Sequence, residues 1–108
     1  MKLLFAIIQN DDTKPLTHAL IDAGISVTRI SSTGGFLSGG NTTLMIGVQD
    51  ERLQDALDAI KTHSSRRQVI TMPSVGVVHS VDCAAMPVSV SVGGATVFIL
   101  NVDEALKF

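Results

Sequence analysis

A short glycine-rich segment, residues 33–40, is the part of this sequence best suited to bind a ligand. Phe36 lies between two glycine pairs, Gly34-Gly35 and Gly39-Gly40. Glycines have no Cβ and adopt positive φ angles readily, so successive backbone N–H groups can converge on an anion. An aromatic ring displayed between them can stack on a base, which is worth ~1–3 kcal/mol in nucleic-acid complexes. The alternative is a flexible hairpin with Phe36 folded onto the core.

Three residues beside this segment extend the candidate site. Asn41 follows it directly, and a carboxamide can make paired hydrogen bonds to an adenine edge. Thr28 supplies a hydroxyl from the strand expected before the segment. Gly47, on the strand expected after it, leaves a gap where a flat ring could approach the backbone. Together they indicate a ligand that carries both a phosphate and a base.

Metal and nucleophile sites are poorly supported. His79, Asp82 and Cys83 lie close together in sequence, but a structural zinc site needs four ligands, and no further residues occur at ligand spacing. A Cys-His pair needs a base oriented by a third group, and nothing indicates one. No two carboxylates suggest an acid and a base, so the sequence favours a binding protein over an enzyme, with no metal and no cofactor.

Arg66 and Arg67 form a basic pair where the second expected helix ends. Positive charge there interacts favourably with the helix dipole, which is the favoured interpretation. The same pair could also contact a phosphate. His18 and His63 lie on the two expected helices, where solvated positions are the simplest account.

The composition excludes several classes of protein. Of 108 residues, 45% are hydrophobic and 17% are charged, which excludes disorder. A net charge of −2 provides no basic face for nucleic acid. The apolar run at residues 3–8 is too short to span a membrane and lacks a cleavage site, so we expect a cytoplasmic protein. The few charges also suggest that other subunits bury part of the surface.

The hydrophobic pattern predicts one domain, residues 1–108, in the order β-α-β-β-α-loop-β-β. Strands are expected at 2–9, 25–32, 41–49, 88–92 and 95–102, with a short extended piece at 67–72. Helices are expected from 11–13 to Gly24 and from Asp50 to 63–65. Gly93-Gly94 predicts a two-residue hairpin turn, and residues from about 73 to 87 form a long loop.

This order indicates an α+β, ferredoxin-like arrangement (split βαβ), an antiparallel sheet with two helices on one face. The other face of the sheet would carry Val, Leu and Ile. We expect it to be covered by packing sheet against sheet in an oligomer.

Two stretches, residues 33–47 and 92–102, resemble the PII-like cyclic-di-AMP receptor family, the PstA proteins. The first strand, residues 1–9, is similar as well, and the similarity covers essentially the whole chain. The second stretch also resembles the last strand of the nitrogen-regulatory PII proteins, which are trimers that bind ATP between subunits.

The resemblance implies a PII-like homotrimer with cyclic-di-AMP at three inter-subunit clefts. It assigns the pocket to Thr28, Gly35, Phe36, Leu37, Asn41 and Gly47. Further candidate contacts are Ser26, Gly93 and Lys107. The family often has Arg at the position of Ser26 and Gln near that of Lys107. By strand alternation Arg29 points to the opposite face from Ser26, so it is a poor substitute for that charge. A neutral hydroxyl makes a weaker phosphate contact than a cation, so the resemblance does not fix the affinity.

We therefore expect a non-enzymatic signalling receptor whose two loops become ordered on binding and change the surface offered to an unknown protein partner. Neither nucleic acid nor a membrane is an expected partner. A PII-like ATP or ADP sensor and a structural trimer without a nucleotide ligand remain alternatives.

Overall fold

The computed structural model describes residues 1–31, 40–71 and 87–108. The strands are β1 (Lys2–Gln9), β2 (Val27–Ser31), β3 (Asn41–Val48), β4 (Arg67–Thr71), β5 (Val88–Val92) and β6 (Ala95–Asn101). The helices are α1 (Thr13–Asp22) and α2 (Leu53–Ser64), each preceded by one 3₁₀ turn. The expected segments 33–40 and 73–87 lie outside the described residues, apart from their ends at Gly40 and Pro87. No helix within the described ranges is long and apolar enough to cross a membrane.

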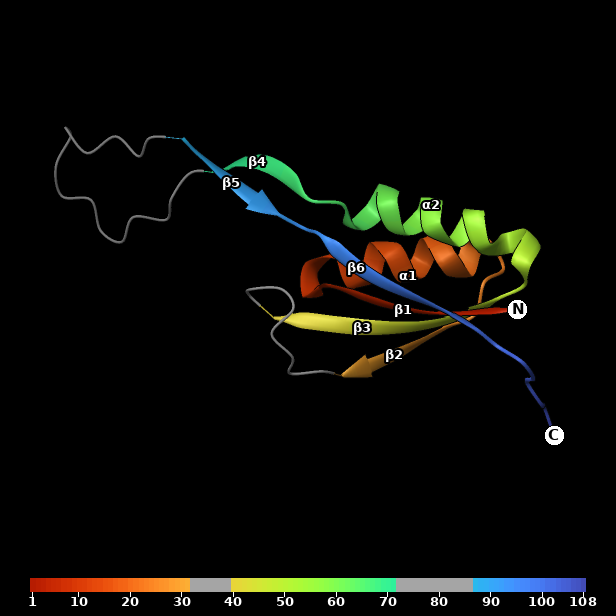
Figure 1. Cartoon of the computed structure of the whole chain (residues 1–108). Helices are drawn as coiled ribbons and strands as arrows, with labels where there is room; N and C mark the ends of the chain where they lie inside the picture. The colour runs from red at the N-terminus through yellow and green to blue at the C-terminus, as the bar shows by residue number, and fades with distance from the viewer. Residues whose placement is uncertain (32–39, 72–86) are drawn as a thin grey trace, which may run out of the picture.

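Four strands form one antiparallel sheet in the order β2-β3-β1-β6, and both helices cover the same face of it (Figure 1). This is a mixed α+β architecture consistent with a ferredoxin-like fold. Strands β2 and β6 form the two open edges of the sheet, so each leaves a row of backbone groups unpaired within it.

The core lies between this sheet and the helices because every second strand residue is apolar and faces them. Leu4 pairs in register with Ile46, and Ala6 pairs with Leu44. These residues are buried together with the inward residues of the helices, which are Leu16, Leu20, Ala56 and Ile60. The expected alternation of β3 is confirmed.

Gly24 terminates helix α1 from the C′ position, directly after the C-cap residue Ala23, as the sequence predicts. Gly24 has a φ of 77°, and its N–H donates to the carbonyl of Ile21 at 2.9 Å. The N–H of Ile25 donates to the carbonyl of Leu20, also at 2.9 Å. This pair of bonds is a Schellman motif, which satisfies carbonyls at the helix end and turns the chain toward β2.

The helix starts differ from expectation, because neither Asp12 nor Asp50 makes a side-chain cap. Both aspartates bind cations instead. Asp50 lies 3.0 Å from the α-amino group of Met1, and Asp12 is buried against Arg67. The sequence has the residues of a helix cap, but their carboxylates form ion pairs with cations that are distant in sequence.

The predicted hairpin at Gly93-Gly94 is wrong. Strand β5 pairs with β4, whereas β6 pairs with β1. The two glycines, with φ angles of 79° and 112°, instead carry the chain from a separate two-stranded ribbon into the sheet. The ribbon, β4 with β5, projects beyond the end of the sheet (Figure 1). The extended piece expected at 67–72 is confirmed as β4.

The helix-free face of the sheet is apolar. Phe5, Met45 and Phe98 lie side by side across three strands, and Leu3 pairs with Leu100 in a neighbouring row. Phe98 and Leu100 are each 45% exposed. A shallow hollow of about 490 Å³ lies over this face. In the described part of the chain, nothing covers this apolar surface.

Candidate ligand site

Three of the predicted pocket residues share the helix-free face. By strand alternation, Asn41 and Gly47 lie on that face of β3, and Thr28 pairs with Met45 between them. Thr28 is exposed, whereas Asn41 is only 8% exposed. Asn41 and Gly47 stand about 20 Å apart along the strand, at ~3.3 Å per residue. The structure therefore brings them onto one face, at opposite ends of β3.

The position of Asn41 is fixed by the contacts of its neighbours with Asn10. The hydroxyl of Thr42 donates to Asn10 Oδ1 at 2.6 Å, and the N–H of Asn10 donates to the carbonyl of Gly40 at 3.3 Å. Gly40 has a φ of 95°, and a Cβ there would lie 2.8 Å from Asn10 Nδ2. A residue with a Cβ at this point, directly before Asn41, would be strained by the positive φ and would displace the Asn10 amide.

Ser26 and Gly47 line one small hollow of about 240 Å³ at the other end of β3. The side chain of Met1 lies over Gly47, since a Cβ on that glycine would be 3.2 Å from Met1 Cε. Arg52 also lines this hollow, and the sequence analysis did not predict a residue from this element there. Arg52 forms an ion pair with Asp55 at 2.8 Å and donates to the carbonyl of Ala23 at 2.6 Å. No local pattern signals that Arg52 and Ser26 line the same hollow, because they belong to different elements.

Arg29 is a poor substitute for a cation at position 26, as expected. It pairs with Leu44 and so lies on the opposite face from Thr28. There it lines a separate hollow beside α1, with Lys14 and His18.

Gly93 lies at the other edge of the sheet, where β6 begins. It borders a hollow of about 670 Å³ between α2, β6 and the base of the ribbon. The lining includes Gln9, Lys61, Ser65, Arg66 and Ser91.

The base of the ribbon is tightly held around Gly93. The N–H of Gly93 donates to Gln9 Oε1, and that of Gly94 donates to the carbonyl of Ser64, both at 2.7 Å. A Cβ at Gly93 would lie 2.4 Å from Arg67 Nη1 and 2.5 Å from the carbonyl oxygen of Ser65. This close approach explains the glycine better than a hairpin turn does.

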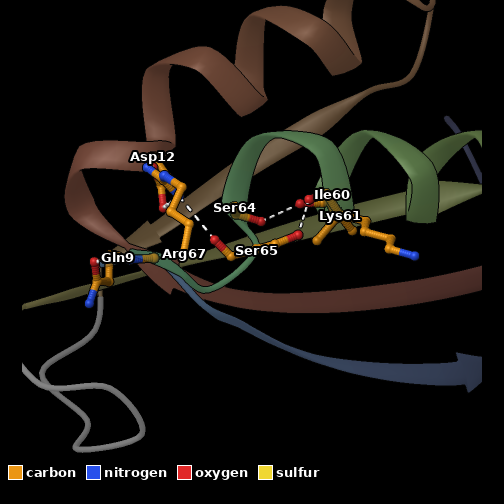
Figure 2. Close-up of polar contacts among 8 residues, drawn as sticks. Gln9, Asp12, Ile60, Lys61, Ser64, Ser65 and Arg67 are labelled. Atoms are coloured by element: carbon orange, nitrogen blue, oxygen red, sulfur yellow. Dashed lines mark hydrogen bonds and ion pairs between the residues drawn. The ribbon is translucent and has the colours of Figure 1, made fainter. Parts of the chain in front are cut away.

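Arg67 binds Asp12 with both arms of its guanidinium, at 2.7 and 3.4 Å, and also donates to the carbonyl of Ser65 (Figure 2). This hydrogen bond with Asp12 raises the pKa of Arg67 above its usual value. The pair links the start of α1 to the start of β4. Of the two adjacent arginines, Arg67 therefore has a structural partner, and only Arg66 lines the hollow.

Lys107 is exposed in the extended segment that follows β6. The candidate contacts therefore divide between the two edges of the sheet: Ser26 and Thr28 are at β2, and Gly93 is at β6. Three strand spacings, about 14 Å, separate those edges, and β3 and β1 fill the space between them.

Several predicted residues lie outside the described ranges. These are Gly35, Phe36, Leu37, His79, Asp82 and Cys83. Within residues 1–31, 40–71 and 87–108, no three His, Cys, Asp or Glu residues are grouped so as to hold a metal ion.

These features are those of a small α+β protein with hydroxyl, amide and glycine positions suited to a nucleotide-like ligand. A family model described as "Cyclic-di-AMP receptor" matches residues 1–108, the whole chain, and the chain belongs to that family. The ligand of this family is cyclic-di-AMP. The chain is also similar to a solved structure, "a functionally unknown protein from Pediococcus pentosaceus ATCC 25745". The two share 40% identity with a TM-score of 0.81, over 99% of this chain and 96% of the other.

Proposed function

We propose that this protein is a non-enzymatic signalling receptor that binds cyclic-di-AMP in clefts between the subunits of a homotrimer. The division of the candidate contacts between opposite edges of one sheet carries the proposal. Within one subunit, Ser26 and Thr28 lie at the opposite edge of the sheet from Gly93, about 14 Å away, with β3 and β1 between them. A second copy that places its β6 edge beside β2 of the first would bring them together.

A closed ring is the assembly that satisfies this arrangement. A contact between two different edges is heterologous, and heterologous contacts close into rings or continue as filaments. The resemblance to PII-like proteins favours a ring of three. The apolar helix-free face supports it, because three such faces would cover each other inside the ring.

Each proposed contact has a role suited to its chemistry. Backbone amides of Gly35–Leu37 and the hydroxyl of Thr28 contact phosphate, Phe36 stacks on a base, and Asn41 reads an adenine edge. Gly47 admits the ligand close to the backbone, while Ser26, Gly93 and Lys107 are further contacts. The expected ordering of the two loops on binding concerns residues outside the described ranges and stays a prediction.

A thermal-shift screen with cyclic-di-AMP, cyclic-di-GMP, ATP and ADP tests the ligand. A ligand at 100 times its dissociation constant adds ~2.7 kcal/mol of stability. A shift with cyclic-di-AMP alone supports the proposal. A shift with ATP or ADP alone supports the PII-like sensor, and no shift with any of them supports a structural trimer.

Calorimetry on Phe36→Ala and Asn41→Ala tests the site. Loss of stacking weakens binding by ~1–3 kcal/mol, and loss of one paired amide contact is of similar size. Circular dichroism controls for folding, which matters for the buried Asn41. Wild-type affinity in both variants would show that the ligand binds elsewhere.

A further inference from the structure

Cyclic-di-AMP presents a charge that the β2 side of the proposed cleft does not balance. The ligand carries two phosphodiester groups, each negative near neutral pH. The described residues proposed to bind it on that side, Ser26, Thr28, Asn41 and Gly47, are all neutral. Arg29 faces the helices, and Arg52 is engaged by Asp55. Apart from the proposed contact Lys107, which follows β6, an uncommitted cation must come from elsewhere.

The hollow beside β6 contains two such cations. Lys61, on α2, and Arg66, just before β4, both line it and are exposed. Neither has an ion-pair partner among the residues that the structure describes. Its described lining contains no carboxylate, so the positive charge there is uncompensated.

The rest of the hollow also suits a nucleotide. Its volume of about 670 Å³ lies in the usual range for small-molecule sites, ~300–1,000 Å³. The lining combines hydroxyls of Ser65 and Ser91 with apolar side chains of α2 and β6. The adjacent ion pair has a consequence here, because Arg67 neutralises Asp12 and so removes the nearby carboxylate that could otherwise attract Arg66.

We propose that Lys61 and Arg66 of one subunit bind the phosphates of the cyclic-di-AMP molecule that rests on β2 and β3 of the next subunit. This inference rests on the proposed function and names the half of each cleft that a neighbouring copy supplies. In the proposed ring the two open edges of the sheet meet, so the hollow beside β6 would lie next to the β2 edge of the neighbouring subunit, which carries Ser26 and Thr28. Cations from the neighbour then replace the charge that Ser26 lacks.

The first test is calorimetric titration of cyclic-di-AMP into Lys61→Gln, Arg66→Gln and the double variant. Each single change removes one charge-assisted hydrogen bond, and this loss should weaken binding about tenfold. The double variant should weaken it further and reduce the salt dependence. Lys14→Gln is the matched control, because Lys14 is an exposed cation on α1 outside this hollow. Wild-type affinity in the double variant would overturn the inference and leave the proposed function intact. No binding by the wild-type protein would instead remove the proposed function.

The second test asks which subunit supplies each half, using mixed trimers. One parent is the double variant Lys61→Gln/Arg66→Gln. The other carries Ser26→Glu and Thr28→Val, two exposed positions at which folding should be unaffected. In a head-to-tail ring, every mixed trimer contains one cleft with both halves intact. Mixing should therefore restore one wild-type-affinity site per mixed trimer. If mixed trimers bind as weakly as both parents, the two halves belong to one subunit and the inference is wrong.

Discussion

Ser26 has an environment that limits what a cation could gain there. It lies in the same small hollow as Arg52, so a second guanidinium at position 26 would meet like charge as well as phosphate. We therefore expect Arg52 to offset part of any gain.

Ser26→Arg should tighten binding of cyclic-di-AMP modestly, between no change and about tenfold. A hydrogen bond to a charged group is worth ~1.5–3 kcal/mol, and fixing a long side chain costs up to ~2 kcal/mol. Titrations at two salt concentrations measure the effect, and the salt dependence should steepen. Weaker binding by a folded variant would show that the pocket is organised around other cations.

Asp50 should titrate at unusually low pH. Hydrogen bonding and charge from the α-amino group of Met1 lower the pKa of this carboxyl, with a smaller contribution from Lys2. A carboxyl whose pKa is lowered in the folded state stabilises the fold at pH values above its ordinary pKa, ~3.9. This stabilisation is lost as the pH falls through the folded-state pKa. Acetylation of the Met1 amine should return the pKa of Asp50 toward its ordinary value. An NMR titration of the carboxyl resonances measures this, and an unchanged pKa would contradict it.

At the scale of elements, the turn from the ribbon into β6 depends on Gly93. Gly93→Ala should destabilise the fold, because the new Cβ would lie 2.4 Å from Arg67 Nη1 and 2.5 Å from the carbonyl oxygen of Ser65, well inside van der Waals contact. A positive φ adds ~1–2 kcal/mol for a residue with a Cβ.

Gly24→Ala is the matched control for that variant. Gly24 has nearly the same φ, 77° against 79°, but nothing lies within 4 Å of its Cβ position. Urea unfolding of both variants should show a greater loss for Gly93→Ala. Equal losses would mean that backbone conformation alone requires glycine at the base of the ribbon.

Local patterns were enough to predict most of the elements. Alternation located the strands, and Gly24 marked the end of α1. The pairing of β5 was not predictable in this way, because a glycine pair between two strands fits a hairpin as well as a crossover between sheets. Two further features left no signal in the sequence, because each joins residues from separate elements. They are the ion pair of Asp12 with Arg67 and the position of Arg52 in the wall of the hollow beside Ser26. Gly35, Phe36 and Leu37 lie outside the described residues, so their proposed roles stay predictions.

At the scale of the whole molecule, assembly depends on the helix-free face. Phe98→Glu should dissociate the proposed trimer, because it places a charge beside Phe5 on a surface that the assembly would bury. Multi-angle light scattering measures the mass. Ile21→Glu is the control, since Ile21 is an exposed apolar residue on α1, away from this face. A trimer that survives Phe98→Glu would place the interface elsewhere.

The shared wall between the hollow and the ribbon has a mechanical consequence. Ser91 belongs to β5 and also lines the hollow, so the ribbon forms part of the wall of the hollow. A five-residue ribbon is about 17 Å long at ~3.4 Å per residue. If the ribbon moves as one body, a tilt of about 10° at its base would move the far end by about 3 Å. A displacement smaller than a bond length at Ser91 would then become this larger shift at the far end of the ribbon, where a bound protein could detect it.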